Sequence, residues 1–266
     1  MIKIGTSGFS FQDWIGTVYP PGIKKGDMLS YYEKHLGFKI TEINATYYTI
    51  PSPKSFAGMI KKTSSDFDFT VKAHKSLTHE IRENNTGKFI DNKEAFERFL
   101  YSIGPLQKEG RLLAVLAQFP YSFHTTEENY NYIRTFQERL KNLPLVVEFR
   151  NGNWHNQKSI AFLKDNHIGY CAVDEPKYKN LMPYNPMVTT DLGYFRFHGR
   201  NPRWFQASAA ERYDYLYSKE ELQSFLPDIE NIARSVSKTI VMFNNCHAGK
   251  SVINAKQLID MLRENS

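Results

Sequence analysis

The sequence predicts an α/β fold, a single (β/α)8 TIM-like barrel with a degenerate sixth helical unit and long strand-end loops. Two observations lead to this prediction. Eight short apolar runs each end in a polar or ionisable cluster, and helix-like segments lie between most of them, an alternation typical of a closed parallel barrel. The length of 266 residues is near the usual size of one such barrel, so we expect one domain over residues 1–266.

The predicted strands are short and apolar, and each is followed by side chains suited to a site. Their ranges are 2–5, 40–43, 67–71, 112–117, 145–147, 169–173, 194–197 and 239–243. Parallel barrels place their active sites at the carboxyl ends of the strands. The pattern therefore predicts where a site lies, although it does not identify a reaction.

Helix signals account for most of the segments between these strands. Thr125 with Glu128, and Ser218 with Glu221, fit capping boxes. Pro227 should kink or split the helix that contains it. We expect helices over residues 28–36, 52–62, 93–100, 125–142, 157–166, 218–236 and 251–264, and a continuation of the third helix to residue 108 stays open.

Four other segments carry no helix signal. Residues 176–191 are rich in Pro, Asn and Tyr, which makes the sixth helical unit degenerate. Residues 7–27, 75–92 and 199–217 are expected to form long loops on the strand-end side of the barrel. Long loops of this kind often carry function.

Composition limits the class of protein. Hydrophobic residues make up 41% of the chain and aromatic residues 14%, too many for a disordered protein. The net charge of +6 mildly favours anionic ligands, although Lys and Arg spread over helix surfaces give the same value.

Cys171 and Cys246 show no metal or redox spacing. The first residues resemble a strand and not a signal peptide, and no run has membrane-spanning length, so we expect a soluble cytoplasmic protein with reduced thiols and no membrane partner.

Ionisable residues recur on one face of several predicted strands. Successive strand residues point to opposite faces, so Lys72 falls opposite the aromatic residues of its strand, as do Arg196 and His198 of theirs. Glu148 and Arg150 share one face in the same way. The aromatic face should pack on the helices, which turns the ionisable face inward. With Glu42 and Asn44, these residues predict a wet polar mouth at one end of the barrel.

A structural alternative explains the same residues. Buried ions require partners, so the charges could form an ion-pair network that closes the top layer of the barrel. The expected pairs are Glu42 with Lys72 or Arg196, and Glu148 with Arg150 or Arg196.

Several motifs run in order along almost the whole chain. They are Gly5-Thr6-Ser7-Gly8, Glu42-Ile43-Asn44-Ala45-Thr46-Tyr47-Tyr48, Phe67-Asp68-Phe69-Thr70-Val71-Lys72, Gln118-Phe119-Pro120, Glu148-Phe149-Arg150, Arg196-Phe197-His198-Gly199-Arg200 and Asn244-Asn245-Cys246. Together they resemble the YecE-like family, a domain of unknown function. The resemblance implies a barrel of eight strands and helices and supplies no activity. The family usually has Gln-Leu-Pro-Pro where this chain has Gln118-Phe119-Pro120-Tyr121.

The leading hypothesis is a phosphate-bearing or other anionic ligand at the carboxyl-end mouth, processed by acid/base chemistry. Arg offers a bidentate fork to phosphate and Lys a point charge, and loops after the last two strands often bind phosphate in barrels. Acid/base chemistry needs a base and an acid nearby, which favours an enzyme such as a hydrolase, lyase or isomerase. The candidate catalytic residues are Glu42, Glu148 and His198. The candidate ligand-binding residues are Thr6, Ser7, Asn44, Lys72, His79, Gln118, Arg150, Trp154, Asp174, Arg196, Arg200, Asn244 and Asn245.

Three alternatives stay open. Cations interleaved with aromatic residues in the loop at 200–217 suit single-stranded nucleic acid, unless those rings pack onto the barrel rim. Glu42, Glu148, Asp174 and His198 are types that bind a divalent metal, as in a metal-dependent endonuclease or sugar-isomerase-like barrel, although the sequence has no close-spaced pair of His residues. A non-catalytic barrel that binds a ligand or a partner would use the same mouth. The oligomeric state is left open.

Overall fold

Eight parallel strands close into a barrel in the computed structural model, which describes residues 1–208 and 211–264. Each strand pairs with the next along the chain, and the last pairs with the first. The strands are β1 (Ile2–Thr6), β2 (Ile40–Ile43), β3 (Asp68–Lys72), β4 (Leu112–Gln118), β5 (Leu145–Glu148), β6 (Gly169–Asp174), β7 (Leu192–Phe197) and β8 (Lys238–Phe243). The predicted barrel is confirmed.

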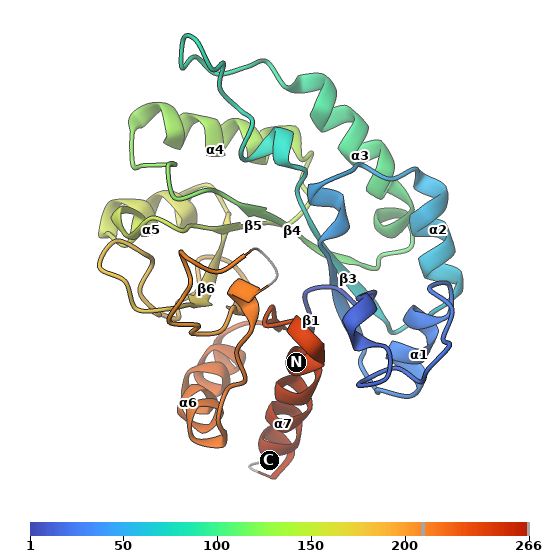
Figure 1. The fold of residues 1–266 in the computed structure, drawn as a ribbon. Coiled ribbons are helices and arrows are strands. Elements are labelled where there is room, and N and C mark those ends of the chain that lie inside the picture. The colour runs from blue at the N-terminus through green and yellow to red at the C-terminus, as the bar shows by residue number, and fades with distance from the viewer. Residues whose placement is uncertain (209–210, 265–266) are drawn as a thin grey trace.

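Helices surround these strands (Figure 1). Within the described residues they are α1 (Met28–Lys34), α2 (Pro53–Lys61), α3 (Lys93–Lys108), α4 (Glu127–Arg139), α5 (Gln157–Asp165), α6 (Lys219–Ser235) and α7 (Lys250–Glu264). Each lies where the sequence predicts a helix. No helix of the described residues is long and apolar enough to cross a membrane.

Two local predictions about helices differ in outcome. The capping box of Ser218 and Glu221 is present at the start of α6. The predicted box of Thr125 and Glu128 is wrong, because α4 starts one residue later and the side chain of Thr126 accepts the backbone N–H of Asn129.

Pro227 does not split α6, which runs without a break from Lys219 to Ser235. A proline inside a helix costs about 3 kcal/mol. The buried face of α6 offsets this cost, since each large apolar side chain removed from water contributes about 1.5–3 kcal/mol. The buried apolar residues of α6 are Leu222, Phe225, Leu226, Ile229 and Ile232.

The chain forms no helix between β6 and β7, as predicted for the degenerate unit. Residues 175–191 instead run as an irregular segment between α5 and α6 (Figure 1). A single bridge between Asn151 and Leu181 ties this segment to the loop after β5. The backbone N–H of Gly152 donates to the carbonyl of Asn180. The missing helix leaves a gap in the outer ring that this segment covers.

The strand faces follow the predicted alternation. Phe195 and Phe197 are fully buried, and the ring of Phe197 stacks on Phe225 of α6 with centroids 4.5 Å apart. Tyr194 and Arg196 of the same strand reach across the barrel interior to Glu42 on β2. The aromatic face therefore packs outward on the helices, and the ionisable face points into the barrel.

Candidate functional site

Arg196 lies between two carboxylates inside the carboxyl end of the barrel. Its Nη2 donates to Oε1 of Glu42 at 2.6 Å, and its Nη1 donates to Oε2 of Glu148 at 2.5 Å. The hydroxyl of Tyr194 donates to the other oxygen of Glu42 at 2.7 Å, and Thr70 lies 2.9 Å from that hydroxyl. These pairs are among those of the predicted ion-pair network. We call Glu42, Glu148 and Arg196 the central ion network.

The central ion network is shielded from water. Glu42, Glu148 and His198 are 0% exposed, and Arg196 is 1% exposed. The prediction of a wet mouth is therefore wrong for Glu42, Glu148 and His198, whereas Arg196 lines the cavity described below although it is buried. The pairing of these side chains with one another makes their burial tolerable.

Glu148 also meets Arg150 and His198. Nε of Arg150 is 2.8 Å and Nε2 of His198 is 3.2 Å from Oε1 of Glu148, although neither contact is aligned as a hydrogen bond. Burial would raise the pKa of Glu148, but the guanidinium groups of Arg196 and Arg150 outweigh it and hold that pKa well below its usual value. Glu148 is thus a permanent anion.

His198 is held in its neutral form. Burial, followed by the charge of Arg150, lowers the pKa of His198 to about 3. Nδ2 of Asn244 lies 2.9 Å from Nδ1 of His198, and because an amide nitrogen donates, Nδ1 accepts and the ring proton stays on Nε2. Nε2 lies 3.2 Å from Oε1 of Glu148 without an aligned hydrogen bond. His198 thus packs beside Glu148, and it does not carry charge at neutral pH.

Arg150 connects the central ion network to a further acid, Glu175. Nη1 of Arg150 donates to Oε2 of Glu175, while the other oxygen of Glu175 is buried without a hydrogen-bond partner. Burial raises the pKa of Glu175 to about 7 despite the neighbouring Arg150. The charge of Arg150 is therefore shared between a permanent anion and an acid that titrates near neutrality.

A cavity of about 470 Å³, which we call the mouth cavity, opens above this layer. Its cations are Lys72, Arg150 and Arg196, and Asp13 is the carboxylate among its lining residues. Asp13 accepts the backbone N–H of Ala248. The remaining lining residues are Ser7, Phe11, Asn44, Tyr47, Tyr48, Tyr213, Asn244, Cys246 and His247. The wall that a ligand meets is therefore more cationic than the layer beneath it.

Lys72, the last residue of β3, differs from the other cations of the mouth cavity. Its Nζ donates to Oε1 of Gln118 at 2.9 Å and lies over the ring of Tyr47 at 4.5 Å from the centroid. Among the described residues no carboxylate oxygen lies within ion-pair distance of Nζ, a limit of 4.0 Å. Burial and the charge of Arg196 lower the pKa of Lys72 to about 7. This amine therefore titrates near neutral pH.

Ten of the candidate residues lie at or next to the mouth cavity, in three positions. Six of them line the mouth cavity, namely Ser7, Asn44, Lys72, Arg150, Arg196 and Asn244. Gln118 contacts Lys72 from the neighbouring strand. The three candidate catalytic residues, Glu42, Glu148 and His198, lie beneath the cavity wall and are not among its lining residues.

Thr6 and Trp154 lie apart from the mouth cavity. Thr6 bonds the hydroxyl of Tyr32 in the wall between β1 and α1. Trp154 stacks on Phe149 with ring centroids 4.1 Å apart, and its Nε1 donates to the carbonyl of Phe123. Both side chains are buried. These positions do not support the expected role of either residue in ligand contact. The Thr6 hydroxyl and Nε1 of Trp154 already form hydrogen bonds with other groups of the protein.

Asn245 and His79 have structural partners as well. Nδ2 of Asn245 donates to Oδ1 of Asn254 at 2.8 Å, which ties the loop after β8 to α7. Nδ1 of His79 lies 2.9 Å from the hydroxyl of Thr78, and its ring packs against Tyr47. Burial and the charge of Lys72 lower the pKa of His79 to about 4. Neither residue lines the mouth cavity.

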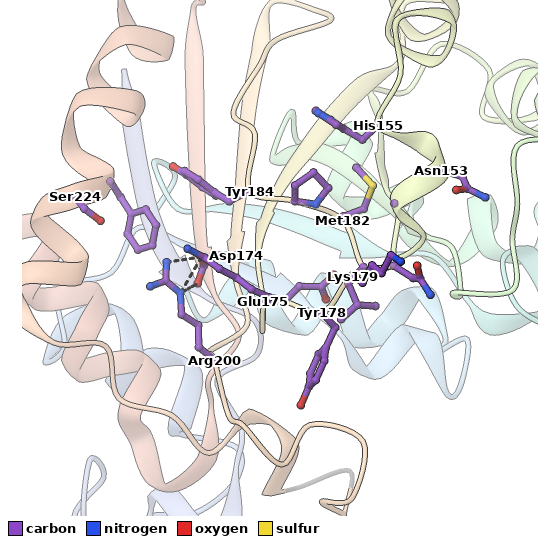
Figure 2. A pocket seen from close by; sticks show the side chains of 16 residues that line it. Asn153, His155, Asp174, Glu175, Tyr178, Lys179, Met182, Tyr184, Arg200 and Ser224 are labelled. Atoms are coloured by element: carbon purple, nitrogen blue, oxygen red, sulfur yellow. Dashed lines mark hydrogen bonds and ion pairs between the residues drawn. The ribbon is translucent and has the colours of Figure 1, made fainter.

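Asp174 and Arg200 lie at a second cavity of about 890 Å³, the side cavity, beside the segment that replaces the sixth helix. Figure 2 shows Arg200 directed at Asp174. Nη2 of Arg200 donates to Asp174 at 2.7 Å and Nη1 donates to Glu221 at 3.0 Å, while Tyr217 donates to Asp174 as well. The side cavity is the larger one, but two carboxylates neutralise its arginine. We therefore place the candidate site in the mouth cavity.

Some residues of the site are not among the candidates from sequence. Tyr194 shares the inward face of β7 with Arg196, so the alternation that identified Arg196 could have found it. Glu175 follows the end of β6, and no spacing signals its contact with Arg150. Tyr213 and Asp13 come from long loops. Loops have no regular alternation from which the direction of a side chain could be predicted.

The described part of the chain offers no group of three or more His, Cys, Asp or Glu side chains placed to hold a metal ion. The carboxylates expected for a metal are bound to arginines: Glu42 and Glu148 to Arg196, and Asp174 to Arg200. A cation among them would have to displace a guanidinium group. These residues do not fit a metal, and no step below involves one.

Two aromatic residues of the loop before α6 are buried, whereas Phe205 is 62% exposed. Trp204 and Tyr217 are buried, and Nε of Arg212 donates to the carbonyl of Trp204. The hydroxyl of Tyr215 donates to Glu221. Residues 209–210 of this loop lie outside the described residues. This packing corresponds to the alternative in which the rings cover the barrel rim, and nucleic-acid binding stays a prediction.

Comparisons with known proteins agree with this fold. A family model described as "Protein of unknown function DUF72" matches residues 3–266. UPF0759 protein YunF of Bacillus subtilis (strain 168) is 29% identical over 274 residues, which cover 98% of this chain and 95% of YunF.

Solved structures of two DUF72 family proteins are similar over nearly the whole chain. The protein from Thermotoga maritima MSB8 has a TM-score of 0.91 and 48% identity, with 99% of each chain covered. The protein from Enterococcus faecalis V583 has a TM-score of 0.85 and 29% identity, with 99% of this chain and 96% of that one covered. The resemblance to the YecE-like family is confirmed, since that is the same family. The chain belongs to the family described as protein of unknown function DUF72.

Proposed function

We propose that the protein binds an anionic ligand, with a phosphate or carboxylate group, in the mouth cavity. The observation that carries this proposal is the charge of the cavity wall. Lys72, Arg150 and Arg196 line it, while the partner acids Glu42 and Glu148 lie beneath the wall. An anion entering the cavity meets the cations before it meets their counter-charges, and burial strengthens the attraction.

Lys72 and Arg150 are the residues that would hold the anion. Lys72 has one hydrogen bond, to a neutral amide, and an ammonium has three protons to donate. Arg196 is less available, because both of its terminal nitrogens already donate to Glu42 and Glu148. Among the described residues, by contrast, only Nη1 of the two terminal nitrogens of Arg150 donates to an acid, Glu175. We assign Arg196 the role of holding the layer beneath the ligand together.

Uncharged groups of the cavity would orient the rest of the ligand. Nδ2 of Asn44 donates to the carbonyl of Ser7 at 3.2 Å, and Oδ1 of Asn44 is buried without a hydrogen-bond partner among the described residues. A buried acceptor without a partner is costly unless a ligand or water satisfies it. A ligand that combines an anionic group with a hydroxyl or amine donor therefore fits this cavity better than a simple anion.

The geometry changes the assignment of acid/base chemistry. Glu148 is a permanent anion and His198 is permanently neutral at physiological pH, and neither lines the cavity. A group that exchanges protons with a ligand should titrate near the working pH and reach the ligand. Lys72 meets both conditions, because its pKa is about 7 and it lines the mouth cavity.

Isothermal titration with sulfate and with inorganic phosphate tests the proposal. Lys72→Met should lower the affinity at pH 6.5 by about tenfold or more, since one charge contact to an anion contributes about 1.5–3 kcal/mol. Lys75→Met is the matched control, because Lys75 pairs with Glu80 at 2.7 Å outside the cavity. Equal affinities of Lys72→Met and the unchanged protein would overturn the proposal.

A further inference from the structure

We propose that Lys72 is a nucleophile that forms an imine with a carbonyl compound whose anionic group is held in the mouth cavity. The substrate class is a 2-oxo acid or a phosphorylated aldehyde or ketone. This inference deepens the proposed function and rests on it, because the anionic group would bring the carbonyl carbon to the amine.

The first argument is the position of Lys72. It ends β3 at the carboxyl-end rim, where barrel enzymes place their reacting groups. Its side chain is partly exposed and lines the mouth cavity. The backbone carbonyl of Lys72 accepts the hydroxyl of Thr46 at 2.6 Å, which fixes the strand end beside β2. The Lys72 side chain therefore extends from the end of a fixed strand into the mouth cavity.

The second argument is its lack of a carboxylate partner. Five other lysines of the described residues form ion pairs, and an ammonium in an ion pair resists deprotonation. Nζ of Lys72 instead meets the neutral amide of Gln118 and the ring of Tyr47. The paired lysines are Lys3 with Asp68, Lys39 with Glu33, Lys75 with Glu80, Lys158 with Glu127 and Lys250 with Asp214.

The charges around Lys72 come from several strands. Arg196 on β7 and Arg150 after β5 disfavour its ammonium form, while Glu148 on β5 and Glu42 on β2 favour it. Burial is the largest influence, and the combined result is a pKa of about 7. A lysine with this lowered pKa supplies the neutral amine, the form that attacks a carbonyl, near pH 7.

The reaction balances without an oxidant or a further reactant. The amine nitrogen attacks the carbonyl carbon, a C–N bond forms, and the π electrons move to oxygen. Both N–H protons pass to that oxygen, the C–O bond breaks, and water leaves. The product is an imine, whose protonated form withdraws electrons from the neighbouring carbon. Such an imine supports lyase and isomerase chemistry of the kind expected from the sequence.

Reductive trapping tests the inference. The full-length protein is incubated with low concentrations of pyruvate and sodium cyanoborohydride at pH 7, and modified lysines are located by peptide mass spectrometry. Lys72 should be modified at least about tenfold faster than Lys75, because the neutral fraction of an amine rises about tenfold for each unit by which its pKa is lowered toward the working pH. Lys72→Arg, which keeps the charge, should abolish the fast modification, and circular dichroism checks that this variant is folded.

Two comparisons separate this inference from the proposed function. Sulfate should slow the modification of Lys72 by pyruvate, and hydroxyacetone, which has no anionic group, should modify Lys72 more slowly. Fast modification by hydroxyacetone with no protection by sulfate would support the nucleophile and overturn the anion site. Sulfate binding that depends on Lys72, together with modification of Lys72 no faster than that of Lys75, would overturn the nucleophile and leave the anion site standing.

Discussion

Nζ of Lys72 donates to Oε1 of Gln118 at 2.9 Å, so a neutral amide on β4 holds the ammonium at the end of β3. This contact satisfies one proton of the ammonium and leaves its charge uncompensated. In the register of β4 and β5, Gln118 pairs with Glu148, a member of the central ion network. Of these two paired residues, Glu148 contacts Arg150 and Arg196, and Gln118 contacts Lys72.

Replacing the amide of Gln118 by a carboxylate should weaken anion binding and keep Lys72 protonated. We expect Gln118→Glu to raise the pKa of Lys72 by 1–3 units, as a nearby opposite charge does for other ionisable groups, and to lower sulfate affinity by about tenfold. Competitive labelling with acetic anhydride across pH measures the pKa, and calorimetry measures the affinity. Gln118→Met, which adds no charge, is the control. A labelling midpoint that stays near 7 in Gln118→Glu would contradict this account.

Sulfate affinity should depend on pH through Lys72. Below about pH 7 the lysine is already charged, and above it binding must bring in a proton, because the pKa of the free protein is lowered to about 7. The affinity should therefore be level below pH 6 and fall by up to about tenfold per pH unit above pH 7. Glu175, whose pKa is raised to about 7, also lowers sulfate affinity as pH rises, because it becomes an anion near the site. A sulfate affinity that rises between pH 7 and pH 9 would contradict this prediction.

The central ion network should matter for stability. Arg196→Met would leave the carboxylates of Glu42 and Glu148 buried without their shared partner. Breaking a buried ion pair from one side costs about 3–5 kcal/mol, so urea unfolding at pH 7 should show a loss of that size.

A combined variant serves as the control for this prediction. Glu42→Gln, Glu148→Gln and Arg196→Met together remove the charges of the central ion network, and we expect them to recover part of the loss because Glu42 and Glu148 no longer remain as buried anions without Arg196. A loss below about 1 kcal/mol in Arg196→Met alone would show that water reaches the network and screens it.

Asp174 should act on stability without acting on the mouth cavity. It accepts hydrogen bonds from Arg200 and Tyr217 and joins β6 to the loop before α6. We expect Asp174→Asn to destabilise the protein by about 1–3 kcal/mol, the cost of weakening buried charged hydrogen bonds. Sulfate affinity should stay within about twofold of the unchanged protein. An affinity loss as large as that of Lys72→Met would show that the side cavity belongs to the binding site.

The sequence predicts the barrel because its signals are local. Short apolar runs, helix caps such as Ser218 and the irregular segment at 176–191 each depend on neighbouring residues. The Thr125 cap failed by one residue, since Thr126 offers the same hydroxyl. The survival of α6 through Pro227 depends on packing against the barrel, which no local pattern contains.

The site was predictable in part for a related reason. Strand alternation correctly turned Lys72, Glu148 and Arg196 to the same end of the barrel. It could not tell which of them line a cavity and which lie beneath it, because that depends on loops whose conformation the sequence does not specify. Trp154 and Arg200 illustrate this limit, because both follow strand ends and bond partners outside the mouth cavity.

Anomalous diffraction from a crystal soaked in sodium selenate tests the central claim most directly. Selenate has the charge and shape of sulfate, and its selenium atom is located without reference to the protein. This account predicts an anomalous peak in the mouth cavity, with selenate oxygens in hydrogen-bond range of Nζ of Lys72 and the guanidinium of Arg150. Selenate bound at other surfaces, with the mouth cavity free of it at saturating concentration, would contradict the account.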